Sequence, residues 1–452
     1  MNLHDTLTAK TKELTTTDGS IKMYVCGITP YAAAHIGHAM RSVVFDVLRR
    51  YLEYRGFDVK YVENFTDIDD KMIASANDMG ITVQDLAEKN IAAYLEEMDA
   101  LNVKRADIYP RATEEIPKIQ EIIGGLIDKD YAYTVQGDVY YRVRKKKDYG
   151  KLGHRTLDTM RVGARIEPGE LKNDPLDFAL WKAEKPGEPS WDSPWGKGRP
   201  GWHIECSAMS LAYLGETLDI HGGGQDLVFP HHENEIAQTE AFNDGKPMAQ
   251  FWVHNGLLRL GEDKMSKSLG NFITVNEALS KFSTDALRLF FLSSHYRSPL
   301  SYTNENVLAQ ERALERIRAA LKESSGNGPS LTTESYKKRF DEAMDDDLNT
   351  PRALAVIFDL CRDINRARDE GGSVDQAQKL LLNLGRILGL TFADDNDSKY
   401  IEAAPFIDLL ISIRKDLREA KQFSVADSIR DNLTELGVTL EDSPEGTTWR
   451  KH

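Results

Sequence analysis

The segment "FPHHENEIAQ", residues 229–238, gathers two histidines and two glutamates directly after a proline. Imidazole and carboxylate groups at this density can hold a metal ion, move protons, or form the polar start of a helix. If a helix begins at Pro230, His231 and Glu235 lie one turn apart on the same face. We therefore expect these two side chains to act together.

The adjacent pair His232 and Glu233 resembles the first half of a helical metalloprotease motif. That motif needs a second histidine at position 236, where the chain has Ile236. The metalloprotease interpretation is therefore excluded. His232 and Glu233 are expected on other faces of the helix, as second-shell or surface groups, and no role is assigned to them.

Two of the three cysteines lie beside such motifs. Cys26 ends an apolar run, and Cys206 lies in "GWHIECSAM". Together with His231 and Glu235 they supply two thiolates, an imidazole and a carboxylate, a donor set suited to tetrahedral zinc. The alternative is that both cysteines are small buried apolar residues. Cys361, in the helical segment "FDLCRDIN", is expected to be a core residue.

The segment "PYAAAHIGHAM" has His35 and His38 on either side of Gly37, at the expected start of a helix. Amides at a helix start favour anionic phosphate oxygens, and the glycine permits close approach of a nucleotide. Imidazole donors can stabilise a phosphate that gains charge in a transition state. The alternative is a pair of polar loop histidines.

The segment "GEDKMSKSLGN", residues 261–271, alternates Lys264 and Lys267 with serines before a glycine. This pattern is typical of a mobile loop that offers two ammonium groups to a polyphosphate. The alternative is an exposed lysine-rich turn. "HIGH" and "KMSKS" in this order are hard to reach by chance, and the pair resembles the class I aminoacyl-tRNA synthetases.

The elements that must position these groups begin with a strand–helix–strand unit. "IKMYVCGIT" predicts a buried strand, "HAMRSVVFDVLRRYLEYRG" an amphipathic helix ended by Gly56, and "FDVKYVENF" a second strand. Such a unit implies parallel strands with a right-handed crossover. Ligands bind such folds at the loop after the first strand.

A chain of 452 residues predicts two to four domains. The stretch "YTVQGDVYYRVRKKKDYGKL" indicates a hairpin with a basic turn inside an insertion, and the chain is predominantly helical from about residue 285 to 390. The expected fold class is α/β, with a Rossmann-type parallel-sheet domain interrupted by the insertion, then a helical domain and a small C-terminal domain. The predicted boundaries are 1–111 with 201–284 for the split catalytic domain, 112–200 for the insertion, 285–392 for the helical domain, and 400–452 for the last domain.

Composition narrows the class of protein further. The net charge of −15 argues against non-specific coating of nucleic acid, although local basic patches are compatible with it. No apolar run approaches the ~20 residues that span a bilayer, and the N-terminal segment lacks the apolar core of a secretory signal. With three cysteines, the chain is expected in the reducing cytoplasm and away from membranes.

Read together, these motifs resemble one family, cysteinyl-tRNA synthetase. The match spans nearly the whole chain, in order and at family spacing. The segments that carry it are "MYVCGIT", "HIGH", "NFTDIDDK", "GWHIECSAM", "HGGGQDLVFPHHENEIAQ", "KMSKSLGNF", "DALRLFFLSSHYRSPL" and "LEDSPEGTTW".

The resemblance implies roles for individual residues. It implies one zinc ion per subunit, which also binds the substrate thiolate, and ATP with Mg²⁺ as the nucleotide. His35, Gly37, His38, Lys264 and Lys267 would face ATP, and the two histidines and two lysines among them would be catalytic. The zinc ligands would be Cys26, Cys206, His231 and Glu235, and the residues contacting the amino and carboxylate groups of cysteine would be Thr66, Trp202, His221 and Asp226.

The resemblance also implies activation of L-cysteine to cysteinyl-adenylate and its transfer to the 3′ end of tRNA(Cys). We expect the protein to be a monomer. A pocket that reads shape alone separates serine from cysteine by only ~1–3 kcal/mol. Zinc discriminates by chemistry, because a thiol ionises on the metal and an alcohol does not do so readily. No editing domain is therefore expected.

In the family, the helical region after residue 285 contacts the inner corner of the tRNA and the last unit reads the anticodon. From 401 to 452 the chain has seven Lys/Arg against ten Asp/Glu, which is no basic footprint. Asp442 and Trp449 are candidates for reading or stacking on bases, and both are equally compatible with structural roles.

Two other functions fit part of the pattern. The mycothiol-pathway ligase shares the zinc and ATP motifs but lacks a C-terminal unit such as the one ending in "GTTW". A nucleotide-regulated RNA-binding protein with a structural zinc would not need both "HIGH" and "KMSKS". Cysteine-dependent pyrophosphate exchange separates the enzymes from the binding protein, and tRNA charging separates the two enzymes.

Overall fold

A computed structural model describes residues 1–16, 18–157, 160, 171–260, 263–264, 272–322, 326, 328–393, 403–443 and 446–451. The chain divides into two compact units, Met1–Phe392 and Ala393–His452. This division does not separate the three regions predicted within the first unit, so their boundaries stay predictions. Among the described residues, no helix has the length and apolar character needed to cross a membrane.

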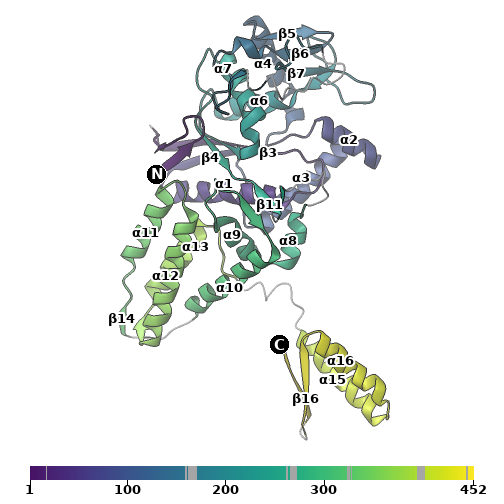
Figure 1. Cartoon of the computed structure of the whole chain (residues 1–452), viewed down its shortest axis with the longest axis vertical. Helices are drawn as coiled ribbons and strands as arrows, with labels where there is room; N and C mark the ends of the chain where they lie inside the picture. The colour runs from purple at the N-terminus through teal and green to yellow at the C-terminus, as the bar shows by residue number, and fades with distance from the viewer. Residues whose placement is uncertain are drawn as a thin grey trace. The chain divides into compact units, whose positions relative to one another are not determined.

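The first unit is built on a four-stranded parallel sheet in the order β10-β9-β3-β4. The predicted strand–helix–strand unit is present, because β3 and β4 run parallel and α1 connects them (Figure 1). This confirms the Rossmann-type fold class. The bounds are β3 Ser20–Ile28, α1 Ile36–Tyr54, β4 Asp58–Phe65, β9 Leu218–Gly224 and β10 Ala249–Asn255.

Helix α1 forms because apolar residues recur along the face that packs on the sheet, and they are almost fully buried. His35 is its N-cap, and Gly56 follows the helix with a positive φ of 90°, a conformation that glycine adopts without strain. The parallel connection therefore ends at the expected glycine. The helix also brings the "HIGH" segment to the carboxyl edge of β3.

The region after β4 contains an antiparallel sheet of its own, in the order β5-β6-β7-β8. The predicted hairpin is β5–β6, but its turn is Gln136–Gly137 and not the basic segment. Both turn residues have positive φ, 51° and 92°, whereas Val143–Lys145 form a separate 3₁₀ turn. The bounds are α2 Asp70–Met79, α3 Val83–Ala100, α4 Ile116–Asp128, β5 Ala132–Val135, β6 Asp138–Tyr141, β7 Phe178–Ala183 and β8 Gly198–Pro200.

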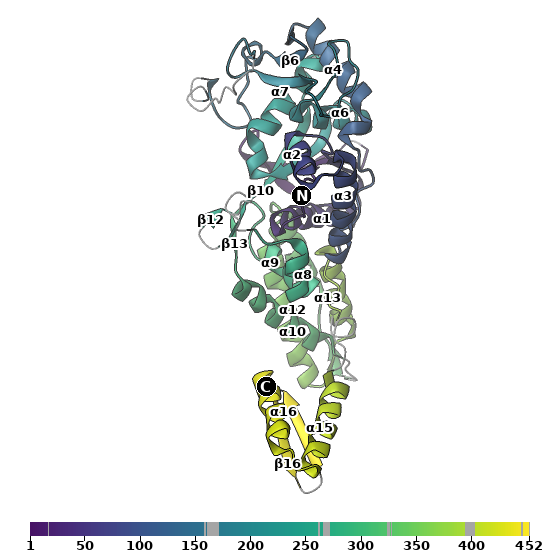
Figure 2. The ribbon, with the colours of Figure 1, turned by 90° about the vertical axis from the view of Figure 1, so that its right-hand side faces the viewer.

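Helices α6 (Trp202–Leu214) and α7 (Glu233–Phe242) lie between this small sheet and the parallel sheet (Figure 1). Figure 2 shows the same order from the side, with the small sheet at one end of the first unit and the helical region at the other. An N-terminal hairpin, β1 (Asn2–Asp5) with β2 (Lys10–Glu13), borders β10, since Thr6 N donates to the Trp252 carbonyl at 2.9 Å.

The remainder of the first unit is predominantly helical, as predicted from residue 285. Cys361 is buried in α12, which confirms it as a core residue. The helical bounds are α8 Val275–Lys281, α9 Thr284–Leu292, α10 Asn304–Leu321, α11 Glu334–Asp345, α12 Thr350–Asp369 and α13 Asp375–Ile387. The short strands are β11 Leu258–Leu260, β12 Asp263–Lys264, β13 Leu300–Tyr302, β14 Gly328–Ser330 and β15 Gly372–Ser373.

The second unit has two helices and an antiparallel hairpin. They are α15 Ala403–Glu419, α16 Phe423–Glu435, β16 Val438–Ser443 and β17 Gly446–Lys451. Its small core contains Ile407, Leu433, Val438 and Leu440. A core of this size is marginal, so polar pairs within the unit matter more to its stability than they do in the first unit.

Candidate metal and nucleotide site

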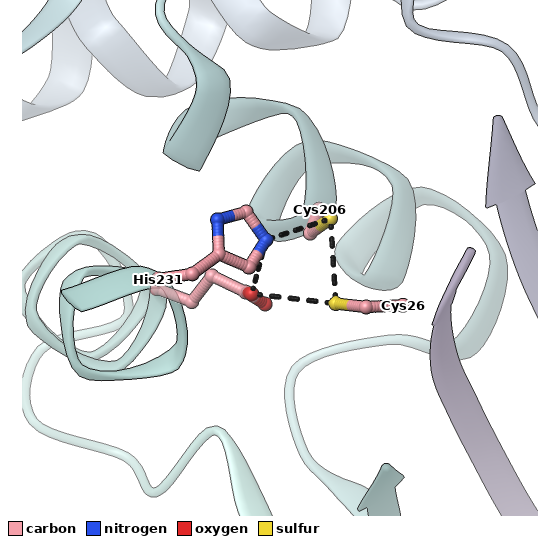
Figure 3. A group of neighbouring side chains, drawn as sticks. Cys26, Cys206 and His231 are labelled. Carbon is pink, nitrogen blue, oxygen red and sulfur yellow. Dashed lines mark hydrogen bonds and ion pairs between the residues drawn. The ribbon is translucent and has the colours of Figure 1, made fainter. Parts of the chain in front are cut away.

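Four side chains that are far apart in the sequence meet beside the carboxyl edge of the parallel sheet. One ligand atom from each lies within 4.8 Å of the others, and all four side chains are buried. In Figure 3, Cys26 comes from a strand, Cys206 and His231 come from two helices, and the three point toward one another. This metal cluster consists of Cys26, Cys206, His231 and Glu235.

The distances in the metal cluster fit a tetrahedral metal. The two Sγ atoms are 3.6 Å apart, and His231 Nε2 lies 3.0 Å from Glu235 Oε1. Cys206 Sγ is 3.6 Å from His231 Nε2, and Cys26 Sγ is 3.5 Å from Glu235 Oε1. Tetrahedral zinc requires about 3.8 Å between two sulfurs and about 3.4 Å between nitrogen and oxygen. The residues present therefore fit a zinc ion with only small adjustments.

A second donor set shares two of these residues. Cys26 and Glu235 also lie close to His221 and His232, and all four are buried. In this set Glu235 Oε2 is 2.7 Å from His221 Nε2, and His232 Nε2 is 3.3 Å from Cys26 Sγ. Two thiolates favour zinc more than one does, and the second set would leave the Cys206 thiol as an unused neighbour. We therefore take the metal cluster as the zinc candidate.

The protonation of the metal cluster is compatible with a bound metal ion. Burial disfavours the Glu235 carboxylate, but His221 and His231 outweigh burial and hold the pKa of Glu235 well below its usual range. Hydrogen bonding to Cys26 lowers the pKa of Cys206 to about 6, whereas burial raises the pKa of the Cys26 thiol well above its usual range. Burial also opposes the imidazolium, yet the Glu235 charge raises the pKa of His231 to about 10. Protons on His231 and Cys26 thus balance the anionic groups, and a metal ion would bind in their place.

Cys26 reaches the metal cluster because the ladder between β3 and β4 breaks there. The register shifts between Val25 and Ile28, which releases Cys26 from regular pairing. At the break, Gly27 N donates to Asn64 Oδ1 at 2.9 Å. A Cβ on residue 27 would lie 1.6 Å from the Asn64 carbonyl oxygen, so the approach of β4 requires glycine here.

Arg41 holds the backbone of the Cys26 segment in place through hydrogen bonds. Its guanidinium is almost fully buried and donates to the Cys26 carbonyl, to Glu63 Oε1 at 2.5 Å and to the Tyr94 hydroxyl at 2.8 Å. Arg41 belongs to α1, so it ties the helix that follows "HIGH" to the strand that carries Cys26. Neither Arg41 nor Asn64 was predicted from the sequence, because their partners come from other segments.

The helical backbone that carries His231 and Glu235 starts where the sequence predicted. Phe229 is extended (φ −142°, ψ 131°), and the residues from Pro230 onward are helical and lead into α7, which begins at Glu233. Pro230 is therefore the first helical residue, as expected for a proline at this position. His231 and Glu235 meet as a pair one turn apart.

His232 and Glu233 are both buried, so the surface alternative for them is wrong. His232 Nδ1 lies 2.8 Å from His254 Nε2, and its other nitrogen contacts Cys26. Glu233 accepts three backbone N–H groups from the loop after β6. His254 was not predicted, and no periodicity marks it in the sequence.

The four residues expected to contact cysteine lie around the metal cluster in different settings. Trp202 is 40% exposed and stacks on the His231 ring at 4.2 Å between centroids. His221 is buried, stacks on Trp252 and bonds to Glu235. Thr66 is buried after β4, and Asp226 is exposed in the 3₁₀ turn Gln225–Leu227. Their roles stay predictions.

His203 also lies beside the metal cluster, although the sequence did not predict it. Its Nδ1 lies 3.0 Å from the Nδ1 of His231, so the Nε2 of His231 faces the metal cluster. A hydrogen bond on the far nitrogen orients a metal-binding imidazole. The sequence shows His203 only as the residue after Trp202 in "GWHIECSAM", and nothing there indicates that its side chain faces His231.

The "HIGH" histidines cap α1. His38 Nδ1 accepts from the His35 backbone at 3.3 Å, and Gly37 N donates to His35 Nδ1 at 3.1 Å. The two rings stack at 3.8 Å between centroids. Lys264 lies in β12, where only the backbone is described, and Lys267 lies outside the described residues.

Comparisons with known proteins agree over the whole chain. Residues 12–312 match the family model for the class I (C) tRNA synthetase catalytic domain, and residues 339–393 match the DALR domain. A cysteine–tRNA ligase of Dehalococcoides mccartyi is 58% identical over 100% of this chain and 99% of its own. A cysteine–tRNA ligase of Geobacillus thermodenitrificans is 48% identical over the same shares of the two chains.

Among solved structures, the chain resembles a Mycobacterium tuberculosis methionyl-tRNA synthetase in complex with methionyl-adenylate. The TM-score is 0.59 over 87% of this chain and 94% of that one, at 16% identity. An Agrobacterium radiobacter leucyl-tRNA synthetase in a ternary complex gives 0.60 over 83% and 84%, at 11% identity. Identities this low support the fold alone.

Proposed function

The chain belongs to the cysteine–tRNA ligase family of class I tRNA synthetases, and we propose that its metal cluster holds the zinc ion that selects cysteine. The activity itself follows from family membership over the full length: ATP-dependent activation of cysteine, then transfer to tRNA. The carboxylate of cysteine attacks the α-phosphate of ATP, which gives cysteinyl-adenylate and pyrophosphate. The terminal ribose hydroxyl of tRNA(Cys) then attacks the adenylate carbonyl.

The observation that supports zinc is the convergence of two sulfurs, one nitrogen and one oxygen at near-tetrahedral separations. When bound, zinc would lower the pKa of the substrate thiol and hold the thiolate, which a hydroxyl does not match. Trp202, which stacks on His231, and His221, which stacks on Trp252, would border the bound side chain and favour a small one. No editing domain is then needed to exclude serine.

The amino acid is proposed to be held at its other end by four residues around the metal cluster. Asp226 is the exposed carboxylate near the carboxyl edge of β9, where it can pair with the ammonium group of cysteine. Trp202 is exposed enough to move over the substrate. Thr66 and His221 supply hydrogen-bonding groups from buried positions.

ATP is proposed to bind with Mg²⁺ at the start of α1. The macrodipole of this 19-residue helix favours phosphate there, and the capping imidazoles of His35 and His38 offer donors to developing charge. Gly37 leaves room beside them. Lys264 and Lys267 are proposed to neutralise the β- and γ-phosphates as pyrophosphate forms.

The tRNA is proposed to extend from the catalytic site along the helical region after residue 285, with the anticodon at the C-terminal unit. The DALR match at 339–393 supports a tRNA-binding role for the helical region. We propose that the chain acts as a monomer in the cytoplasm, where its three free cysteines would stay reduced.

The decisive experiment has two stages. Cysteine-dependent exchange of pyrophosphate into ATP measures activation without tRNA, and labelled cysteine on purified tRNA(Cys) measures transfer. We expect both, together with one zinc per chain by elemental analysis. Replacement of zinc by Co²⁺ should give thiolate-to-metal absorption bands, which cysteine should perturb and serine should not. A Co²⁺ spectrum without thiolate bands would place the metal elsewhere.

A further inference from the structure

An open cavity lies near the metal cluster. It has a volume of about 460 Å³ and is lined by three segments of the first unit. These are the N-terminal segment with Thr6, the loop 152–155 after β6, and the loop 225–229 after β9. His254 and Arg297 complete the walls. We call it the three-segment pocket.

The lining of the three-segment pocket combines a stacking platform with cations. The Arg155 guanidinium lies over the Phe229 ring, 4.8 Å from its centroid. Arg297 adds a second guanidinium, which also pairs with Asp347 at 2.7 Å. The pocket thus offers a planar surface for a base and positive charge for a phosphate, the pair of features by which proteins hold single-stranded nucleic acid.

The three-segment pocket is separated from the metal cluster by two imidazoles. His254 lines the pocket and lies 2.8 Å from His232, which contacts Cys26 at 3.3 Å. On the pocket side, His254 Nδ1 is 2.8 Å from Thr6 Oγ1. Asp226, proposed above to hold the amino group of cysteine, also lines the pocket. A ligand in the pocket therefore lies next to the activated amino acid.

Glu233 holds the loop that supplies one wall. Its Oε1 accepts from Gly150 N at 2.8 Å, and its Oε2 accepts from Leu152 N at 2.9 Å and Gly153 N at 3.0 Å. The loop also closes on itself, since Arg155 N donates to the Gly150 carbonyl at 3.0 Å. Gly150 has a φ of 99°, which this closure requires.

Glu233 occupies the position between the two cluster residues of its helix. His231 and Glu235 face the metal cluster, whereas Glu233 faces the loop. One turn of α7 therefore sets the position of the pocket wall relative to the metal cluster. Three charge-assisted hydrogen bonds to backbone N–H groups make this a firm connection.

We propose that the three-segment pocket receives a nucleotide of the single-stranded 3′ end of tRNA, and that Glu233 is the positioning residue that keeps its Arg155-bearing wall in place. This inference rests on the proposed function, because only the transfer step brings an RNA end to the activated cysteine. The shared chemistry of the ligand is a base with a phosphate, so ATP is the competing source.

The first experiment replaces the platform cation. Arg155→Ala should lower kcat/KM for tRNA(Cys) by about tenfold, in line with the loss of one stacking contact. Cysteine-dependent pyrophosphate exchange and the KM for ATP should stay within about twofold of wild type. Lys185→Ala is the matched control, because it removes an exposed cation from the same region outside the pocket, and both reactions should stay unchanged.

The source of the nucleotide is tested by binding. The wild-type chain should bind intact tRNA(Cys) more tightly than tRNA(Cys) that lacks its 3′-terminal nucleotides, and Arg155→Ala should abolish this difference. If Arg155→Ala instead raises the KM for ATP in the exchange reaction, the pocket belongs to ATP and the proposal is wrong. If the wild type neither exchanges pyrophosphate nor charges tRNA, the proposed function itself fails, independently of this pocket.

The second experiment tests how far tRNA charging depends on the hydrogen bonds that Glu233 accepts from the loop. Glu233→Gln retains one acceptor oxygen, whereas Glu233→Ala retains none. Charging of tRNA should fall in the order wild type, Gln, Ala, while pyrophosphate exchange and zinc content stay close to wild type. Equal losses of exchange and charging in both variants would show that Glu233 only supports α7 and its metal ligands, and would overturn its positioning role.

Discussion

The candidate residues of the metal cluster converge on one point, whereas those of the C-terminal unit pair with other residues of that unit. The four side chains of the cluster are buried and converge on one point from β3, α6 and the start of α7. In the C-terminal unit, Asp442 forms a paired contact with Arg414, at 2.9 Å for both oxygens. Trp449 Nε1 donates to Asp408 at 3.1 Å. The cluster residues face a shared ligand position, whereas the C-terminal pair is engaged within its own unit.

Under the proposed function, this difference separates two kinds of specificity. Selection of cysteine would depend on the four donor atoms that converge in the metal cluster. If the C-terminal unit reads the anticodon, as proposed, it needs exposed groups that do not hold the unit together. The contacts of Asp442 and Trp449 within the unit favour structural roles for both, so base reading would fall to other side chains.

The strongest test of this contrast removes one sulfur of the metal cluster. Cys206→Ser should lower cysteine-dependent pyrophosphate exchange by about 1,000-fold. Loss of a residue that only hydrogen-bonds to a metal ligand already lowers metal affinity or activity by about 10–100-fold, and loss of a ligand should cost more. The loss should lie in cysteine binding far more than in ATP binding, and His231→Ala should behave alike. Steady-state exchange kinetics with each substrate varied separately measure the two effects.

Cys361→Ser is the matched control, because it changes a buried cysteine of α12 by the same single atom. Its exchange activity should stay close to wild type at low temperature. If Cys206→Ser weakens ATP and cysteine to the same extent, the metal is a structural staple and the contrast with the C-terminal unit disappears.

A smaller effect is expected from the second nucleotide motif. Lys267→Ala should slow adenylate formation by about 100-fold with little change in the affinity for ATP, because its charge is needed as pyrophosphate develops. Single-turnover kinetics separate the rate from the affinity. Lys281→Ala, an exposed lysine at the end of α8, is the control. A large loss of ground-state ATP binding would assign Lys267 to holding ATP instead.

The sequence predicted the features that depend on residue type and local spacing. The parallel unit of β3, α1 and β4 follows from apolar periodicity, and the convergence of Cys26 and Cys206 with the helical pair follows from the donor types that zinc prefers. The fold class was also predictable, because the motifs occur in the order typical of one kind of catalytic domain. The family match and the structural similarity confirm it.

The sequence did not predict features that depend on backbone conformation or on distant partners. The hairpin turn was misplaced because Gln136 adopts a positive φ, which that residue type does not signal. The contacts of Asn64 and His254 join segments that only the folded sheet brings together.

In the C-terminal unit, Asp442→Asn should lower the free energy of unfolding by about 0.5–1 kcal/mol, the range of a well-aligned but partly exposed ion pair. Hydrogen exchange of the amides in residues 403–451 measures this loss without disturbing the first unit. Asp431→Asn is the control, because it removes an exposed carboxylate of α16 in the same unit. Unchanged stability together with a selective loss of tRNA charging would make Asp442 a base-reading residue after all.

The same ion pair should give the unit a small dependence on pH. The hydrogen bond from Arg414 lowers the pKa of Asp442 to about 2, from a value of 3.8 in an unfolded chain. A lowered carboxyl pKa stabilises the folded unit fully above pH 3.8 and loses that contribution as the pH falls toward 2. Wild type and Asp442→Asn should therefore differ in stability at pH 6 and converge near pH 2, by less than about 1 kcal/mol because the carboxylate is 43% exposed. A difference that persists at pH 2 would mean that packing or the hydrogen bond from Thr447, and not the charge pair, is what the substitution removes.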